Sequence, residues 1–227
     1  MYQLFNIGVY CFLFVIISDK IIIKEEFKYP DGPAPKNLFW SEGCPGNIRN
    51  GRLFIDADTA AQRASSVWLN QELSGDLSIE FDVFLLSSSD DANNINLFFM
   101  YGDASGDPLK QTASQRQDGL YQRYHKLKGF IVTNVTNNDS VNIRYRLRKN
   151  PGFTLVRQSQ MKRIKRQNKI HIKLLKQGEH FQYWENDNKI FDEQITDADK
   201  QYAKGLFGFR TWHTSMEIDN LLIKRIE

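Results

Sequence analysis

The sequence predicts an all-β fold, an antiparallel β-sandwich, on three observations. Apolar and polar residues alternate over many short stretches, as they do in strands that bury one face. Clusters of Gly, Asn, Asp and Ser separate these stretches at short intervals and favour tight reversals. No window shows the apolar stripe of an amphipathic helix. Many short strands with turns at this spacing are typical of a sandwich or barrel.

The predicted strands can be placed in order along the chain. The clearest covers residues 77–85, in which every odd position is apolar. Two longer stretches without alternation, 29–50 and 102–124, are predicted to be loops of the kind that carries binding residues. The complete set of predicted strands is 77–85, 96–101, 129–135, 141–148, 169–175, 180–184, 189–191, 205–210 and 216–223.

Length and composition indicate one domain. The 227 residues contain no internal linker rich in Pro, Gly or Ser, so we predict a single domain over residues 19–227. Hydrophobic residues make up 41% of the chain, which is enough for a packed core. The net charge of +3 gives no argument for nucleic acid, and the basic run 161–166 lacks interleaved aromatic residues. We interpret that run as a solvated loop and expect no nucleic-acid partner.

The first 18 residues form an apolar run that is followed at once by charged residues. This pattern predicts a signal peptide over residues 1–18, although the run lacks an initial Lys or Arg. It is shorter than the roughly 20 residues that span a bilayer. We therefore expect a secreted or periplasmic protein with no membrane span after cleavage, and a retained anchor is the alternative. The mature chain would keep only the thiol of Cys44, and so no disulfide.

Four blocks in the second half of the chain resemble a known group of proteins. They are GLYQRYH at 119–125, RYRLRKNPGF at 144–153, GLFGFRTW at 205–212 and EIDNL at 217–221. In this order they resemble the YesU-like bacterial proteins, which lie among polysaccharide-utilisation genes. The resemblance extends over about residues 77–226 and implies the jelly roll of the concanavalin A-like lectin/glucanase superfamily. It also implies a carbohydrate context, with acidic plant or algal polysaccharides as the substrate class, but it carries over no catalytic residue.

A row of arginines is the first candidate for ligand binding. Alternation along 141–148 places Arg144, Arg146 and Arg148 on one face of the strand, ~6.6 to 6.8 Å apart. A guanidinium group can hold a carboxylate or sulfate through two parallel hydrogen bonds and stays charged at any working pH. This row therefore favours an acidic polysaccharide or oligosaccharide as partner. The alternative is that the arginines face solvent and pair with acids on a neighbouring strand.

Tyr121, Tyr124 and His125 are the candidate catalytic residues. A lyase that cleaves next to a uronic acid needs a cation to neutralise the carboxylate, a base for the C5 proton and an acid for the leaving oxygen. Histidine and tyrosine can supply the base and the acid. The alternative is a loop whose aromatic rings pack on the sandwich or stack on sugars without reaction. The candidate substrate-binding residues are Arg144, Arg146, Arg148, Asn150 and Trp212.

A glycoside hydrolase is less favoured. Hydrolysis of a glycosidic bond needs two carboxylates across a cleft, and glucanases of this fold typically carry them in an E-x-D-x-x-E strand. Residues 80–82 and 217–219 begin that pattern, but leucine replaces the third acid in both. We interpret both pairs as exposed faces of half-buried strands.

No cofactor is expected from the sequence. The histidines lack the spacing of metal ligands. A structural calcium ion could use Asp90, Asp91 and Asn93. Two hypotheses therefore remain open: a lyase that acts on an acidic polysaccharide, and a non-catalytic carbohydrate-binding protein that uses the same residues.

Overall fold

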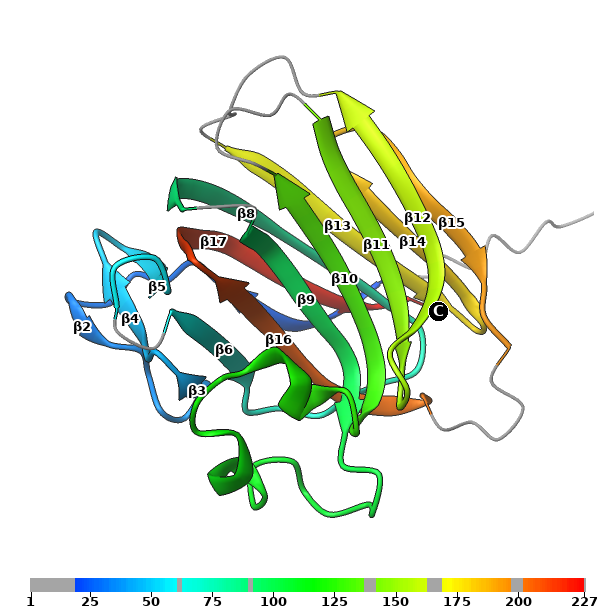
Figure 1. Ribbon diagram of the computed structural model, residues 1–227, viewed down its shortest axis with the longest axis horizontal. Helices are drawn as coiled ribbons and strands as arrows, with labels where there is room; N and C mark the ends of the chain where they lie inside the picture. The colour runs from blue at the N-terminus through cyan, green and yellow to red at the C-terminus, as the bar shows by residue number, and fades with distance from the viewer. Residues whose placement is uncertain are drawn as a thin grey trace, which may run out of the picture.

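The computed structural model describes residues 19–60, 63–89, 92–136, 142–162, 169–196 and 202–226. Two antiparallel sheets pack face to face in a sandwich (Figure 1). The order of strands in sheet A is β15-β14-β13-β8-β17-β5-β4-β2, with β1 also paired to β17, and the order in sheet B is β12-β11-β10-β9-β16-β6-β3, with β7 also paired to β16. The predicted all-β sandwich is confirmed.

Sheet A consists of β1 (Lys20–Glu25), β2 (Gly32–Pro33), β4 (Gly46–Arg49), β5 (Arg52–Asp56), β8 (Leu77–Ser88), β13 (Ile170–Gln177), β14 (His180–Glu185), β15 (Asn188–Gln194) and β17 (Thr214–Arg225). Sheet B consists of β3 (Phe39–Gly43), β6 (Ala64–Leu69), β7 (Leu73–Ser74), β9 (Ala92–Gly102), β10 (Lys128–Thr136), β11 (Asn142–Asn150), β12 (Thr154–Lys162) and β16 (Lys204–Trp212). Two short 3-10 helices, η1 (Ala113–Arg116) and η2 (Tyr121–Tyr124), lie between β9 and β10. No helix among the described residues is long and apolar enough to cross a membrane.

The alternation seen in the sequence produces the core between the sheets. Phe81 of β8 is buried from sheet A and contacts the buried Phe207 and Phe209 of β16 from sheet B, with ring centroids 6.0 and 5.0 Å apart. Each such side chain contributes about 1.5 to 3 kcal/mol through removal from water. The nine predicted strands all occur, and each is extended by a few residues at one or both ends.

The structure corrects the prediction for residues 29–50. This stretch contains β2, β3 and β4 and is therefore not one irregular loop. Its strands are only two to five residues long, too short for alternation to be read against the surrounding turn-forming residues. The edge strand β12 was also missed, because it is mostly exposed and its sequence is polar on both faces. β1, β5, β6 and β7 were not predicted either.

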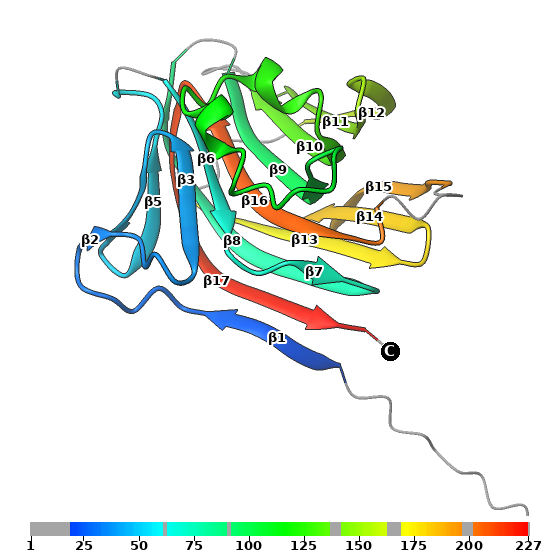
Figure 2. The same ribbon diagram turned by 90° about the horizontal axis from the view of Figure 1, so that it is seen from below.

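A second apolar cluster lies on the outer face of sheet B, the face turned away from sheet A. The segment 103–127 folds over this face, as Figure 2 shows, so the stretch 102–124 is a loop as predicted, apart from η1 and η2. The apolar cluster on this face includes Trp68 of β6 and Phe98 of β9, whose ring centroids are 5.0 Å apart. The whole cluster consists of Trp68, Phe98, Tyr101, Leu109, Tyr124, Leu127 and Ile131.

Some sequence predictions lie outside the described residues. They are the signal peptide at 1–18, most of the basic run 161–166, and the calcium candidates Asp90 and Asp91. The side chain of Asn93 also lies outside them.

Candidate functional site

The outer face of sheet B carries a continuous polar row. Strand register places one residue from each neighbouring strand side by side across the sheet, so that Arg146 of β11 pairs with Thr133 of β10 and Arg210 of β16 pairs with Ser66 of β6. Arg144 and Arg148 flank this row on β11, as the sequence alternation predicts. The row in strand order is Gln158, Arg146, Thr133, Asn96, Arg210, Ser66 and Glu42.

The segment 103–127 brings Tyr121 and His125 onto this row. The Tyr121 hydroxyl lies 3.3 Å from the Thr133 hydroxyl, and its ring lies 4.4 Å from the Arg210 guanidinium carbon. The His125 ring is 5.0 Å from the Tyr121 ring, edge to face. A phenol, an imidazole and a buried guanidinium therefore meet at one point of the outer face.

Phe153 connects this group to the arginine row. The His125 ring stacks on the Phe153 ring at 3.8 Å between centroids. The Arg148 guanidinium also lies over the Phe153 ring, with its central carbon 4.0 Å from the ring centroid. Arg148 Nη1 donates a hydrogen bond of 2.9 Å to the Phe153 carbonyl. No carboxylate among the described residues lies within ion-pair distance of Arg148, so its charge is available to an anion.

A buried ion pair anchors the segment 103–127 to sheet B. Arg116 Nε and Glu42 Oε1 are 2.8 Å apart, with side-chain exposures of 3% and 1%. The other Glu42 oxygen accepts a hydrogen bond from Trp68 Nε1 at 3.1 Å. Gly43 and Gly119 let the two backbones approach, since both have positive φ and a side chain on Gly43 would lie 2.2 Å from a backbone oxygen.

The environment sets the charge states of the candidate catalytic residues. Burial, followed by the charges of Arg210 and Arg148, lowers the pKa of His125 below its usual range. The His125 imidazole is therefore neutral at pH 7 and is able to accept a proton. Burial raises the pKa of Tyr121, although Thr133 and the nearby arginines oppose this shift. Tyr121 is therefore a protonated donor at pH 7.

Two of the predicted site residues, Tyr124 and Asn150, are buried beneath the surface of the candidate site. Tyr124 is fully buried, with its ring 4.8 Å from that of Phe98, and burial raises its pKa strongly, so it cannot act as a base. Asn150 is also fully buried. Its amide donates to Tyr101 Oη at 2.6 Å and to the Tyr124 carbonyl at 3.2 Å. These contacts fix the backbone beneath the catalytic candidates.

The other predicted binding residues lie on the outer face of sheet B. Arg146 donates a 3.0 Å hydrogen bond from Nε to Gln158 Oε1, and Arg144 is half-buried. Trp212 is half-buried at the end of β16, on the same face as Arg210, with its ring 4.1 Å from that of His213. The structure thus gathers Tyr121, His125, Arg144, Arg146, Arg148 and Trp212 on one surface.

Sequence reasoning missed Arg210, Thr133 and Phe153 as parts of this site. Arg210 ends the predicted strand 205–210, and continuing its alternation by two residues would have placed Arg210 and Trp212 on one face. Nothing in the sequence shows that this face meets the segment 103–127, because the contact joins residues about 90 positions apart.

The paired carboxylates lie on the other side of the molecule. Glu217 and Asp82 are on the outer face of sheet A and are almost fully buried in ion pairs, which corrects the expectation of exposure for these two acids, whereas their partners Glu80 and Asp219 are half-buried. Glu217 binds Arg49 at 2.8 Å and Arg52 at 3.1 Å, while Asp82 binds Lys169 at 2.8 Å. Carboxylates held in this way do not form an acid-base pair across a cleft. Among the described residues no group of His, Cys, Asp and Glu is arranged to hold a metal ion.

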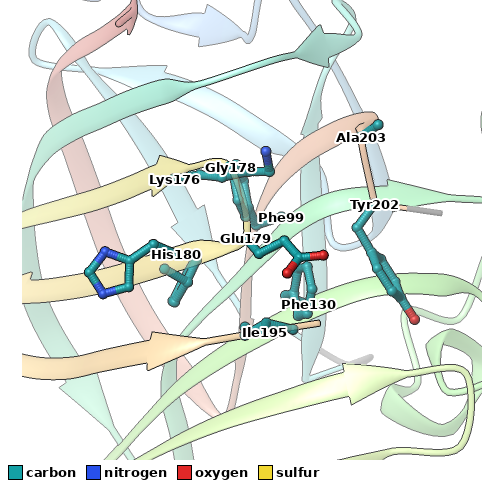
Figure 3. A pocket seen from close by; sticks show the side chains of 10 residues that line it. Phe99, Phe130, Lys176, Gly178, Glu179, His180, Ile195, Tyr202 and Ala203 are labelled. Atoms are coloured by element: carbon teal, nitrogen blue, oxygen red, sulfur yellow. The ribbon is translucent and has the colours of Figure 1, made fainter. Parts of the chain in front are cut away.

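An apolar cavity of about 340 Å³ lies between the two sheets near the β13–β14 turn (Figure 3). Phe99 and Phe130 enter it from sheet B and Phe181 from sheet A. The polar groups at its rim are already bonded, since Lys176 donates to the Gly75 carbonyl and His180 pairs with Asp192. This cavity is separate from the polar row on the outer face of sheet B.

Comparison with known proteins identifies the fold. The family model described as "Domain of unknown function (DUF6250)" matches residues 59–221. A protein of unknown function with a galectin-like fold from Bacillus subtilis superposes with a TM-score of 0.69 at 14% identity, covering 92% of this chain and 98% of its own. No curated protein matches the sequence.

Two further solved structures share the fold. The endo-β-1,3-glucanase from Pyrococcus furiosus has a TM-score of 0.62 at 9% identity, covering 93% of this chain and 96% of its own. The carbohydrate-binding module CBM66 from Bacillus subtilis has a TM-score of 0.55 at 13% identity, covering 83% and 97%. At these identities the likeness establishes the concanavalin A-like jelly roll, as predicted, while the narrower resemblance to YesU-like proteins stays a prediction.

Proposed function

Because this chain belongs to the family described as a domain of unknown function, DUF6250, we propose its function from the site itself: it binds and cleaves an acidic polysaccharide on the outer face of sheet B. The observation that carries the proposal is the meeting of His125 and Tyr121 with the guanidinium groups of Arg148 and Arg146 on one surface. Neutral sugars do not need several fixed positive charges, whereas uronates and sulfates do.

The structural neighbours support a carbohydrate partner. One is a glucanase, one is a carbohydrate-binding module, and another was solved with laminaritriose and laminaritetraose. Since fold does not fix function, the class of glycan is inferred from the charges on the outer face of sheet B. We also propose that the protein is exported, on the basis of the apolar run at residues 1–18.

Each step of a β-elimination has a candidate group in this site. Arg148, with Arg146 beside it, would neutralise the uronate carboxylate and so acidify the C5 proton. His125 would accept that proton, because its lowered pKa keeps it neutral at pH 7. Tyr121 would donate a proton to the leaving glycosidic oxygen, because its raised pKa keeps it protonated. The C4–O bond breaks as the C4–C5 double bond forms, so no oxidant or cofactor is required.

The direct test is absorbance at the unsaturated-uronate band during incubation with pectic, alginate, glucuronan and ulvan-type chains. We expect a rise with one class, and a fall of about 10² to 10⁴ in kcat for His125→Ala and Tyr121→Phe. Tyr29→Phe is the matched control, because Tyr29 bonds Glu25, part of sheet A. If no polymer gives a rise, or if both site variants keep full activity, the proposed elimination is wrong.

A non-catalytic carbohydrate-binding protein is the second candidate. It is favoured by the stacking of His125 on Phe153 and by the burial of His125 Nε2, which faces no hydrogen-bond partner in the described part of the chain. A protein of this kind should migrate more slowly in a gel that contains one acidic polymer and should show no turnover of that polymer. Arg146→Met should then weaken binding about tenfold or more in a salt-dependent way. Arg157→Met, an exposed arginine paired with Glu193, controls for the change in net charge.

A further inference from the structure

A fully buried arginine that has no counter-charge in the described part of the chain lies beneath the segment 103–127. Arg210 is 1% exposed, and its Nη2 donates a 3.3 Å hydrogen bond to the Gly119 carbonyl. Its Nε and Nη1 have no hydrogen-bond partner among the described residues. Within those residues no carboxylate reaches ion-pair distance of the guanidinium either. A buried charge in this state is costly, and native proteins normally compensate it.

The groups around Arg210 do not supply the missing negative charge. Its neighbours Tyr121 and Tyr124 present their rings, at 4.4 and 6.0 Å from the guanidinium carbon, and both phenols are protonated. The acid in the same cross-strand row, Glu42, is already committed to Arg116 at 2.8 Å. Arg148 adds further positive charge to the same region. Its charge and that of Arg210 both contribute to lowering the pKa of His125.

A second buried donor without a partner lies directly across the strand pair. Ser66 is opposite Arg210 in the register of β6 and β16, and both side chains are on the outer face of sheet B. Directly opposite residues have Cβ atoms about 4.5 to 5.5 Å apart. The Ser66 hydroxyl is buried and has no hydrogen-bond partner in the described part of the chain. Two guanidinium N–H groups and one hydroxyl on directly opposite residues therefore lack an acceptor in the described part of the chain.

We propose that a small monovalent anion of the halide class binds between Arg210 and Ser66, beneath the ring of Tyr121. The donors are shielded from solvent beneath the ring of Tyr121, so the site would favour a compact anion over the bulkier carboxylate of a sugar ring. The anion neutralises Arg210 and so stabilises the seating of the segment 103–127, which carries Tyr121 and His125. The anion site lies beneath the residues proposed for cleavage and takes no part in the cleavage step itself.

Thermal unfolding of the intact protein tests the site. Tm is measured while sodium chloride or bromide replaces sodium methanesulfonate at constant ionic strength. We expect Tm to rise with the logarithm of halide concentration above its Kd, by about 5 to 11 °C once the halide reaches roughly 100 times its Kd. Arg210→Met should abolish the dependence, and Ser66→Ala should shift it to higher halide concentration. Arg146→Met, which removes a half-buried guanidinium from the same face, should leave the halide dependence of Tm unchanged.

Two further measurements keep the proposal refutable if Arg210→Met folds poorly. Crystals soaked in bromide should show an anomalous peak between Arg210 and Ser66, and sodium glucuronate should not reproduce the rise in Tm. A Tm that follows ionic strength alone, with no bromide peak at this position, would overturn the proposal. A glucuronate response that Arg210→Met removes would also overturn it, and would assign Arg210 to the sugar carboxylate.

Discussion

Breaking the buried pair of Glu42 and Arg116 is expected to be the most destabilising single charge change in the segment 103–127. Both side chains are at most 3% exposed, so removing one partner leaves a charge in a medium that solvates it poorly. Arg116→Met should cost about 3 to 5 kcal/mol, because Glu42 then keeps hydrogen bonds such as that from Trp68 but no ion-pair partner among the described residues. For a chain of this size that corresponds to a fall of about 6 to 20 °C in Tm.

The stability lost in Arg116→Met should increase with pH. Burial already raises the pKa of Glu42 above its ordinary value, and Arg116 opposes that rise. Without Arg116 the pKa rises further, so the folded state binds a proton that the unfolded state releases at neutral pH. Stability then falls as pH increases through the range between the two pKa values. The cost of Arg116→Met is therefore expected to be larger at pH 7.5 than at pH 5.5.

The assay is urea unfolding followed by tryptophan fluorescence at both pH values. The double variant Glu42→Gln with Arg116→Met should recover much of the loss, because no charge remains buried. Arg123→Met is the matched control: its pair with Asp118 is exposed, so its loss should stay below about 1 kcal/mol. A cost below 1 kcal/mol for Arg116→Met, or no recovery in the double variant, would refute the reasoning.

Three other outcomes follow from the same contacts. Gly43→Ala should lower the free energy of unfolding by at least about 1 to 3 kcal/mol, because φ is +74° and the new Cβ would meet the Ala64 backbone oxygen at 2.2 Å; circular dichroism melts measure this. Glu217→Gln should cost about 1.5 to 3 kcal/mol by weakening its charge-assisted hydrogen bonds, measured by urea unfolding. Arg148→Met should raise the pKa of His125 toward its usual value and move the acid limb of the cleavage profile to higher pH, so an unmoved limb would contradict His125 as the base.

The site could be predicted only in part. Alternation on a single strand placed Arg144, Arg146 and Arg148 on one face, because side-chain direction in a strand has a period of two. The residue types of Tyr121 and His125 indicated proton transfer, but their sequence did not distinguish them from Tyr124, which is buried against Phe98. Burial of a loop residue depends on what the loop folds onto, and local sequence does not encode that.

The sequence by itself determined the all-β class, most of the long strands and the sidedness of the arginine row. These properties are local, since they follow from alternation and turn-forming residues within about ten positions. Only the tertiary structure decided which face of the sandwich carries the site. It also showed that Arg210 lies buried beneath Tyr121, and that the edge strand β12 exists at all. Those features depend on register between strands far apart in the chain and on desolvation, which arise only when the two sheets and the segment 103–127 pack together.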